Sequence, residues 1–160
     1  MDRLVGPPGL MLSIVGLLNA AYAAVYGLWT LMPLAFTLSF VASRAAEVTP
    51  EDLFWLLVVA TAIPLLQLLG FAACLFASGV TVLAGIRLVQ GRSRGLVWLG
   101  IGAAVGVPVA GLALNGLSGV NLTLMGSGCY GCLLGNVPTL VLLLVDLPLG
   151  CVAAYALRHR

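Results

Sequence analysis

The sequence predicts an all-α, polytopic integral membrane protein, a single domain over residues 1–160 built as a bundle of four transmembrane helices. The 160 residues are 62% hydrophobic and only 8% charged, whereas soluble domains are about 45–50% apolar and about 25% charged. The apolar residues fall into four blocks, and a membrane-spanning helix needs about 20 such residues. These observations exclude a water-soluble monomer, a disordered chain and a nucleic-acid-binding protein.

The first two blocks cover residues 9–41 and 53–89, and each contains an internal proline. The first block begins like a signal peptide, with a cleavage-type motif at 21–23, but its apolar run continues to Val41. A retained span is therefore expected. The second block follows a helix-start signature, because Thr49 can cap the helix, Pro50 suits its first position and Asp52 completes a capping box.

The third and fourth blocks cover residues 96–117 and 133–157. The short polar turn at 90–95 makes the second and third helices antiparallel neighbours. A stretch rich in Gly, Ser and Asn, residues 118–131, separates the third block from the fourth and is predicted to be a loop.

The first two helices are longer than a bilayer requires. Their 33 and 37 residues would extend about 50 Å and about 55 Å, against about 30 Å of hydrocarbon. The excess lies in residues 34–41 and 53–63, which carry the aromatic residues Phe36, Phe40, Phe54 and Trp55. Either these helices tilt, with the aromatic residues at the membrane interface, or a helical hairpin leaves the bilayer and needs a partner to cover it.

The basic residues predict an orientation. All seven are arginines, and four spans place both termini and the 90–95 turn on one side. Six of the arginines lie on that side, whereas Arg44 lies on the other side with Glu47, Glu51 and Asp52. The positive-inside rule then places both termini in the cytoplasm.

Small residues recur at four-residue spacing on the first three helices. Such stripes allow helix backbones to approach closely in a membrane. They predict a compact bundle, but they do not distinguish packing within the chain from oligomerisation. The members of the three stripes are Gly16, Ala20 and Ala24 on the first helix, Ala73, Ala77, Thr81 and Gly85 on the second, and Gly102, Gly106 and Ala110 on the third.

Cys129 and Cys132 form a C-x-x-C motif just before the fourth helix. Two such thiols can form a disulfide or a redox couple. Together with the four helices, this motif resembles the vitamin K epoxide reductase type of thiol–quinone oxidoreductase. That family also uses a cysteine pair in its first outer loop, and residues 43–52 contain none. A structural disulfide or two inactive thiols is the preferred interpretation, and Cys74 and Cys151 are interpreted as small apolar core residues.

Asp146 lies near the middle of the fourth block. A central aspartate costs about 2.5–3.5 kcal/mol on insertion scales, so such residues face the bundle and often mark ion or proton paths. Its expected partners are polar residues of the second and third helices, or it carries a proton. Interhelical hydrogen bonding is the preferred role and transport the alternative; the candidate partners are Asn115, Gln67, Ser78 and Thr81.

Several Gly- and Pro-containing segments resemble a group of small, uncharacterised bacterial membrane proteins with four hydrophobic segments. The resemblance implies a four-helix layout in a bacterial inner membrane and no assigned activity. The longer stretch between Pro108 and Pro148 departs from that group. The segments that carry the resemblance are residues 6–11, 84–89, 91–96, 102–108 and 148–150.

The composition favours a non-catalytic membrane subunit or scaffold. The chain has no lysine for Schiff-base chemistry, and its one histidine, His159, lies outside the apolar blocks. Neither a cofactor nor a metal is therefore expected. The expected partners are the lipid bilayer and either a second protein or another copy of the chain. The alternatives are a thiol oxidoreductase that uses Cys129 and Cys132, and a small ion or proton channel or carrier that uses Asp146.

Overall fold

The computed structural model describes residues 6–44, 47, 49–91, 94–124 and 130–158. Within these residues every regular element is an α-helix. The helices are α1 (Gly6–Trp29), α2 (Leu31–Arg44), α3 (Pro50–Val89), α4 (Arg94–Leu124) and α5 (Tyr130–Arg158).

The first predicted helix is divided into α1 and α2 at Thr30. Pro33 has no N–H to donate to the carbonyl of Trp29, so the helical hydrogen-bond series is interrupted one turn before the proline. At the junction, the N–H of Thr30 donates to the carbonyl of Tyr26 at 3.1 Å, and its Oγ1 donates to the carbonyl of Gly27 at 2.6 Å. The interruption is small, because the N–H of Leu34 still reaches the carbonyl of Thr30 at 3.5 Å.

The predicted start of α3 is confirmed. The Oγ1 of Thr49 accepts a hydrogen bond from the N–H of Asp52, and Pro50 occupies the first helical turn. The helix then continues through Pro64 for 40 residues. It ends at Val89, and Gly91 follows with φ 73°, a left-handed conformation that glycine adopts without steric cost.

The loop predicted at residues 118–131 is shorter in the structure. Helix α4 continues to Leu124, and α5 begins at Tyr130. Glycine is more frequent in membrane helices than in soluble ones, and no proline lies between Pro108 and Pro138 to end the helix. The predicted span of 96–117 agrees with the candidate span Arg94–Leu117, and the helix itself continues to Leu124.

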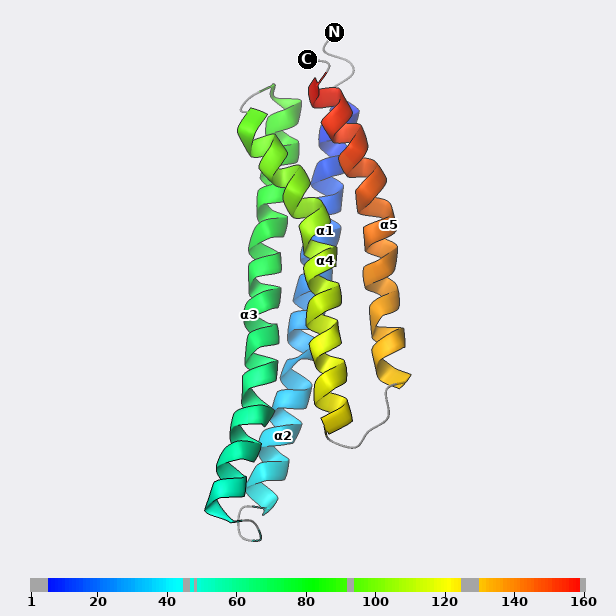
Figure 1. The fold of residues 1–160 in the computed structure, drawn as a ribbon. Helices are drawn as coiled ribbons and strands as arrows, with labels where there is room; N and C mark the ends of the chain where they lie inside the picture. The colour runs from blue at the N-terminus through cyan, green and yellow to red at the C-terminus, as the bar shows by residue number, and fades with distance from the viewer. Residues whose placement is uncertain (1–5, 45–46, 48, 92–93, 125–129, 159–160) are drawn as a thin grey trace.

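The helices form an elongated bundle in which α1 packs along α3, α3 along α4 and α4 along α5. The start of α1, the end of α5 and the α3–α4 turn lie at one end (Figure 1). At the other end, α2 and the first turns of α3 project beyond α4 and α5 (Figure 1). We call α2 and residues 50–60 of α3 the arm.

Four stretches are long and apolar enough to cross a membrane, which indicates an integral membrane protein. They are Gly6–Ser43, Thr61–Val89, Arg94–Leu117 and Asn136–Arg158.

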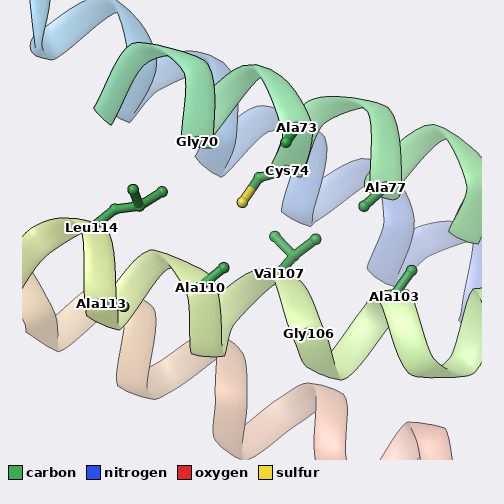
Figure 2. Close-up of a pocket in the computed structure, with 10 residues that line it drawn as sticks. All are labelled: Gly70, Ala73, Cys74, Ala77, Ala103, Gly106, Val107, Ala110, Ala113 and Leu114. Atoms are coloured by element: carbon green, nitrogen blue, oxygen red, sulfur yellow. The ribbon is translucent and has the colours of Figure 1, made fainter. Parts of the chain in front are cut away.

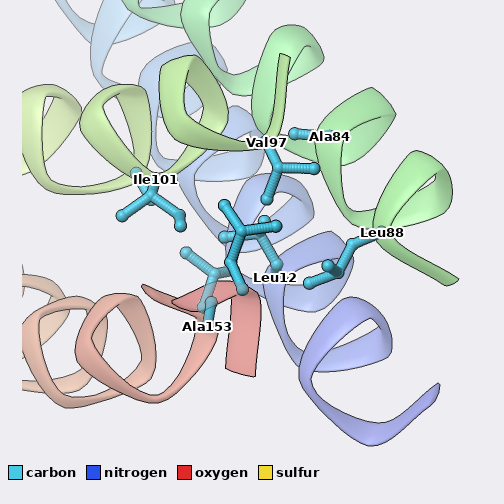
Figure 3. Packing of buried hydrophobic residues seen from close by; sticks show 9 residues of the cluster. Leu12, Ala84, Leu88, Val97, Ile101 and Ala153 are labelled. Atoms are coloured by element: carbon cyan, nitrogen blue, oxygen red, sulfur yellow. The ribbon is translucent and has the colours of Figure 1, made fainter. Parts of the chain in front are cut away.

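The main apolar core lies near the end of the bundle that holds the first turns of α1 and the last turns of α5 (Figure 3). Leucine, isoleucine and valine side chains from α1, α3, α4 and α5 pack against alanines of α3, α4 and α5. Its buried members are Leu12, Val15, Ala84, Leu88, Val97, Ile101, Ala104, Ala153 and Leu157.

Glycines bring the backbones of α1 and α3 into direct contact. A Cβ at Gly9 would lie 2.8 Å from the carbonyl oxygen of Gly85, and one at Gly16 would lie 2.8 Å from the backbone nitrogen of Val82. Gly16 and Gly85 of the predicted stripes therefore lie in a helix interface. Gly102 and Gly106 of α4 make no such close approach, because a Cβ at either position would meet nothing within 4 Å.

Candidate functional site

Asp146 is fully buried, with 0% of its surface exposed, near the centre of the α5 candidate span. Its Oδ2 accepts a hydrogen bond of 2.8 Å from Nδ2 of Asn19 on α1. The same Nδ2 donates to the backbone carbonyl of Ala104 on α4 at 3.2 Å. One side-chain amide thus joins three helices at the carboxyl group.

The bond to Ala104 has a local cause in α4. Pro108 lies four residues after Ala104 and has no N–H, so the carbonyl of Ala104 lacks its usual helical donor. Asn19 supplies that donor from α1. In a membrane, a carbonyl without its helical donor needs a hydrogen bond from a neighbouring side chain or a water molecule, or a local distortion of the helix. Here the side-chain amide of Asn19 donates that hydrogen bond.

A second polar junction lies nearby and joins the same three helices. The hydroxyls of Tyr22 on α1 and Thr139 on α5 share a hydrogen bond of 2.7 Å. Nδ2 of Asn115 on α4 donates to both of these oxygens at 3.2 Å. Tyr22 lies three residues after Asn19, on the same face of α1, so the two junctions form a polar seam between α1, α4 and α5.

The predicted partners of Asp146 make other contacts. Gln67 joins α3 to α4, since its Nε2 donates to the carbonyl of Leu114 at 2.8 Å. Ser78 donates to the carbonyl of Cys74. Thr81 lies within reach of the carbonyls of Ala77 and Gly100. The expectation that Asp146 pairs with Asn115, Gln67, Ser78 or Thr81 is therefore replaced by the bond to Asn19.

Two buried oxygens at the first junction have no hydrogen-bond partner. They are Oδ1 of Asn19 and Oδ1 of Asp146, and both residues are 0% exposed. Buried acceptors that lack a donor are uncommon, and each one calls for an explanation such as a bound water, an ion or a proton.

A shallow apolar groove of about 400 Å³ runs between α3 and α4 (Figure 2). Small side chains open it, because Gly70, Ala73 and Ala77 on α3 face Gly106 and Ala110 on α4. Its lining is almost entirely apolar and includes the thiol of Cys74 (Figure 2).

The predicted redox pair is only partly covered. Cys129 lies outside the described residues, and Cys132 lies in α5 with its side chain outside them as well. Cys74 is buried and Cys151 is exposed, and both are free thiols. The interpretation of Cys151 as a core residue is therefore wrong, whereas Cys74 lies in a small core cluster with Ala23 and Val107.

Among the described residues, no three histidine, cysteine or acidic side chains lie close enough to hold a metal ion. What the site offers is one buried carboxyl group, two amides and two hydroxyls on three helices.

No protein-family model, curated protein or solved structure matches this chain.

Proposed function

We propose that the chain is a non-catalytic subunit of a larger complex in the bacterial inner membrane, with both termini in the cytoplasm. In this proposal the arm binds a second, different membrane protein. The single observation that carries the proposal is the arm itself, a two-helix extension with large apolar side chains exposed on both helices.

The length of α3 supports a role for the arm beyond crossing the bilayer. Its 40 residues extend about 60 Å, about twice the hydrocarbon thickness. Phe54 and Trp55, near the far end of the arm, are each 60% exposed, and Phe36, in the first half of α2, is 70% exposed. Apolar area left in water costs about 25 cal/mol per Å², so an arm outside the hydrocarbon gains stability when a partner covers it.

The charges at the tip favour a different protein over a second copy. Glu47, Glu51 and Asp52 are all exposed at the α2–α3 connection and the start of α3. Two copies with parallel arms would place these acidic groups side by side, which is unfavourable. A partner with an apolar groove and a basic rim would complement both the aromatic side chains and the acidic tip.

Replacing Phe36 and Trp55 together with serine is expected to release the partner. Buried aromatic side chains commonly contribute about 2 kcal/mol or more to an interface, so the amount of co-purified partner should fall at least about tenfold. The measurement is native mass spectrometry of the full-length protein extracted from its own membrane in mild detergent. Phe76→Ser is the matched control, because Phe76 is 78% exposed on α3 outside the arm.

A lone monomer from the wild-type chain would contradict the proposal, and so would equal loss of the partner in the Phe76→Ser control. A complex of identical copies that depends on the arm would show self-association instead.

Raising the salt concentration should weaken the predicted complex, because the contacts proposed between the acidic tip and a basic rim of the partner are ionic and exposed.

A further inference from the structure

The carboxyl group of Asp146 has acceptors around it and a shortage of donors. Nδ2 of Asn19 supplies one hydrogen bond to Oδ2. Oδ1 of Asp146 and Oδ1 of Asn19 have none. An ionised carboxylate would therefore be buried at the centre of a membrane span with a single neutral donor.

No cationic side chain compensates this group within the described part of the chain. The groups that face the first junction from α1 and α4 are the amide of Asn19 and the carbonyl of Ala104. Along the seam, the next titratable group is the Tyr22 hydroxyl, bonded to Thr139. The other described charged residues are exposed and lie toward the helix ends: Glu47, Glu51, Asp52, Arg87, Arg94 and Arg158.

We propose that the Asn19–Asp146 pair is a proton-binding site, with the proton held on Oδ1 of Asp146. An uncompensated ion in such a place costs several kcal/mol, and protonation removes the charge. Protonation also adds an O–H donor at a place where two buried acceptors, Oδ1 of Asn19 and Oδ1 of Asp146, have no hydrogen-bond partner. A proton needs no extra volume among side chains with no exposed surface, unlike a water molecule or a metal ion.

The site links proton binding to the packing of α1, α4 and α5. A hydronium ion of the solvent supplies the proton: one of its O–H bonds breaks, leaving water, and an O–H bond forms on Oδ1 of Asp146. In the unfolded chain an aspartate ionises above about pH 4, so at neutral pH the folded protein holds one more proton than the unfolded chain. Stability therefore falls as the pH rises.

Infrared spectroscopy of the full-length protein in lipid vesicles tests the site directly. At neutral pH the wild-type spectrum should contain the C=O stretch of a carboxylic acid, and Asp146→Asn should abolish it. The matched control is Asp52→Asn, at an exposed position, which should leave the band unchanged. Labelling the aspartate carboxyl carbons with ¹³C should move the wild-type band to lower frequency, so the test does not depend on the folding of the variant.

Thermal unfolding gives a second readout. Between about pH 5 and about pH 9 the midpoint for the wild type should decrease, because the unfolded chain has released the proton that the folded site still holds. Asp146→Asn should show a smaller dependence on pH, since its amide N–H replaces the proton as a donor. Absence of a carboxylic acid band at neutral pH would overturn the proposal, and so would identical pH profiles for the two proteins.

Discussion

Replacing Gly85 with alanine is expected to destabilise the bundle by about 1–3 kcal/mol, the range for overpacking a close-packed site. A Cβ at this position would lie 2.6 Å from the carbonyl oxygen of Gly9 and 2.7 Å from the backbone nitrogen of Ser13. Both contacts are to backbone, so no side-chain rotation relieves them. Helix α1 would have to move away from α3, which would weaken the bond from Ser13 Oγ to the carbonyl of Val82, now 3.4 Å.

Gly79→Ala is the matched control for this prediction. Gly79 lies in the same helix, but a Cβ there would meet nothing within 4 Å. Its replacement removes the same backbone freedom and is expected to be neutral or stabilising by up to about 1 kcal/mol. Reversible unfolding of both variants from mild-detergent micelles, followed by circular dichroism, measures the difference. Equal effects of the two substitutions would show that the close approach of α1 and α3 does not limit stability.

The glycines of the small-residue stripes show which part of helix packing the sequence can predict. The four-residue spacing identified Gly16 and Gly85 as packing residues, and both lie between α1 and α3. The same spacing identified Gly102 and Gly106 on α4, where an added Cβ would meet nothing within 4 Å. Spacing shows which residues share a helix face. It does not show how that face is rotated toward its neighbours, which depends on all the side chains of the bundle.

Local signals were more dependable than long-range ones. The start of α3 could be predicted because Thr49, Pro50 and Asp52 interact within a single turn. The excess length of the first two predicted helices corresponds to α2 and the first turns of α3, which project beyond α4 and α5 (Figure 1). The partner of Asp146 could not be predicted, because Asn19 is 127 positions away in the chain.

One signal in the sequence pointed toward Asn19. Pro108 leaves the carbonyl of Ala104 without its helical donor, and a polar side chain of a neighbouring helix at that depth is one of the groups that can replace it. Asn19 is the asparagine of the first apolar block. Choosing it over other polar residues still needed the register of α1 against α4, which only the packed bundle provides.

Replacing Asn19 with leucine is expected to destabilise the bundle by about 1–3 kcal/mol, the cost of leaving a buried polar group without its partner. The substitution removes the donor to Oδ2 of Asp146 and the donor to the carbonyl of Ala104 together. Hydrogen bonds between membrane helices average only about 0.6 kcal/mol, but here a carboxyl group and a proline-freed carbonyl both lose their partner. Leucine is also larger than the asparagine that it replaces, and overpacking this buried position adds to the loss of stability.

A double-mutant cycle with Asp146→Leu separates these effects. Once Asp146 is replaced, the Asn19→Leu substitution no longer strands a carboxyl group, so its additional cost should be smaller than in the wild type. The expected coupling is about 0.5–2 kcal/mol, measured by the same reversible unfolding. Additive losses would mean that the 2.8 Å bond between Asn19 and Asp146 contributes nothing to stability. The stability lost in Asn19→Leu would then come from the bond to the carbonyl of Ala104, because that bond is lost whether or not Asp146 is present.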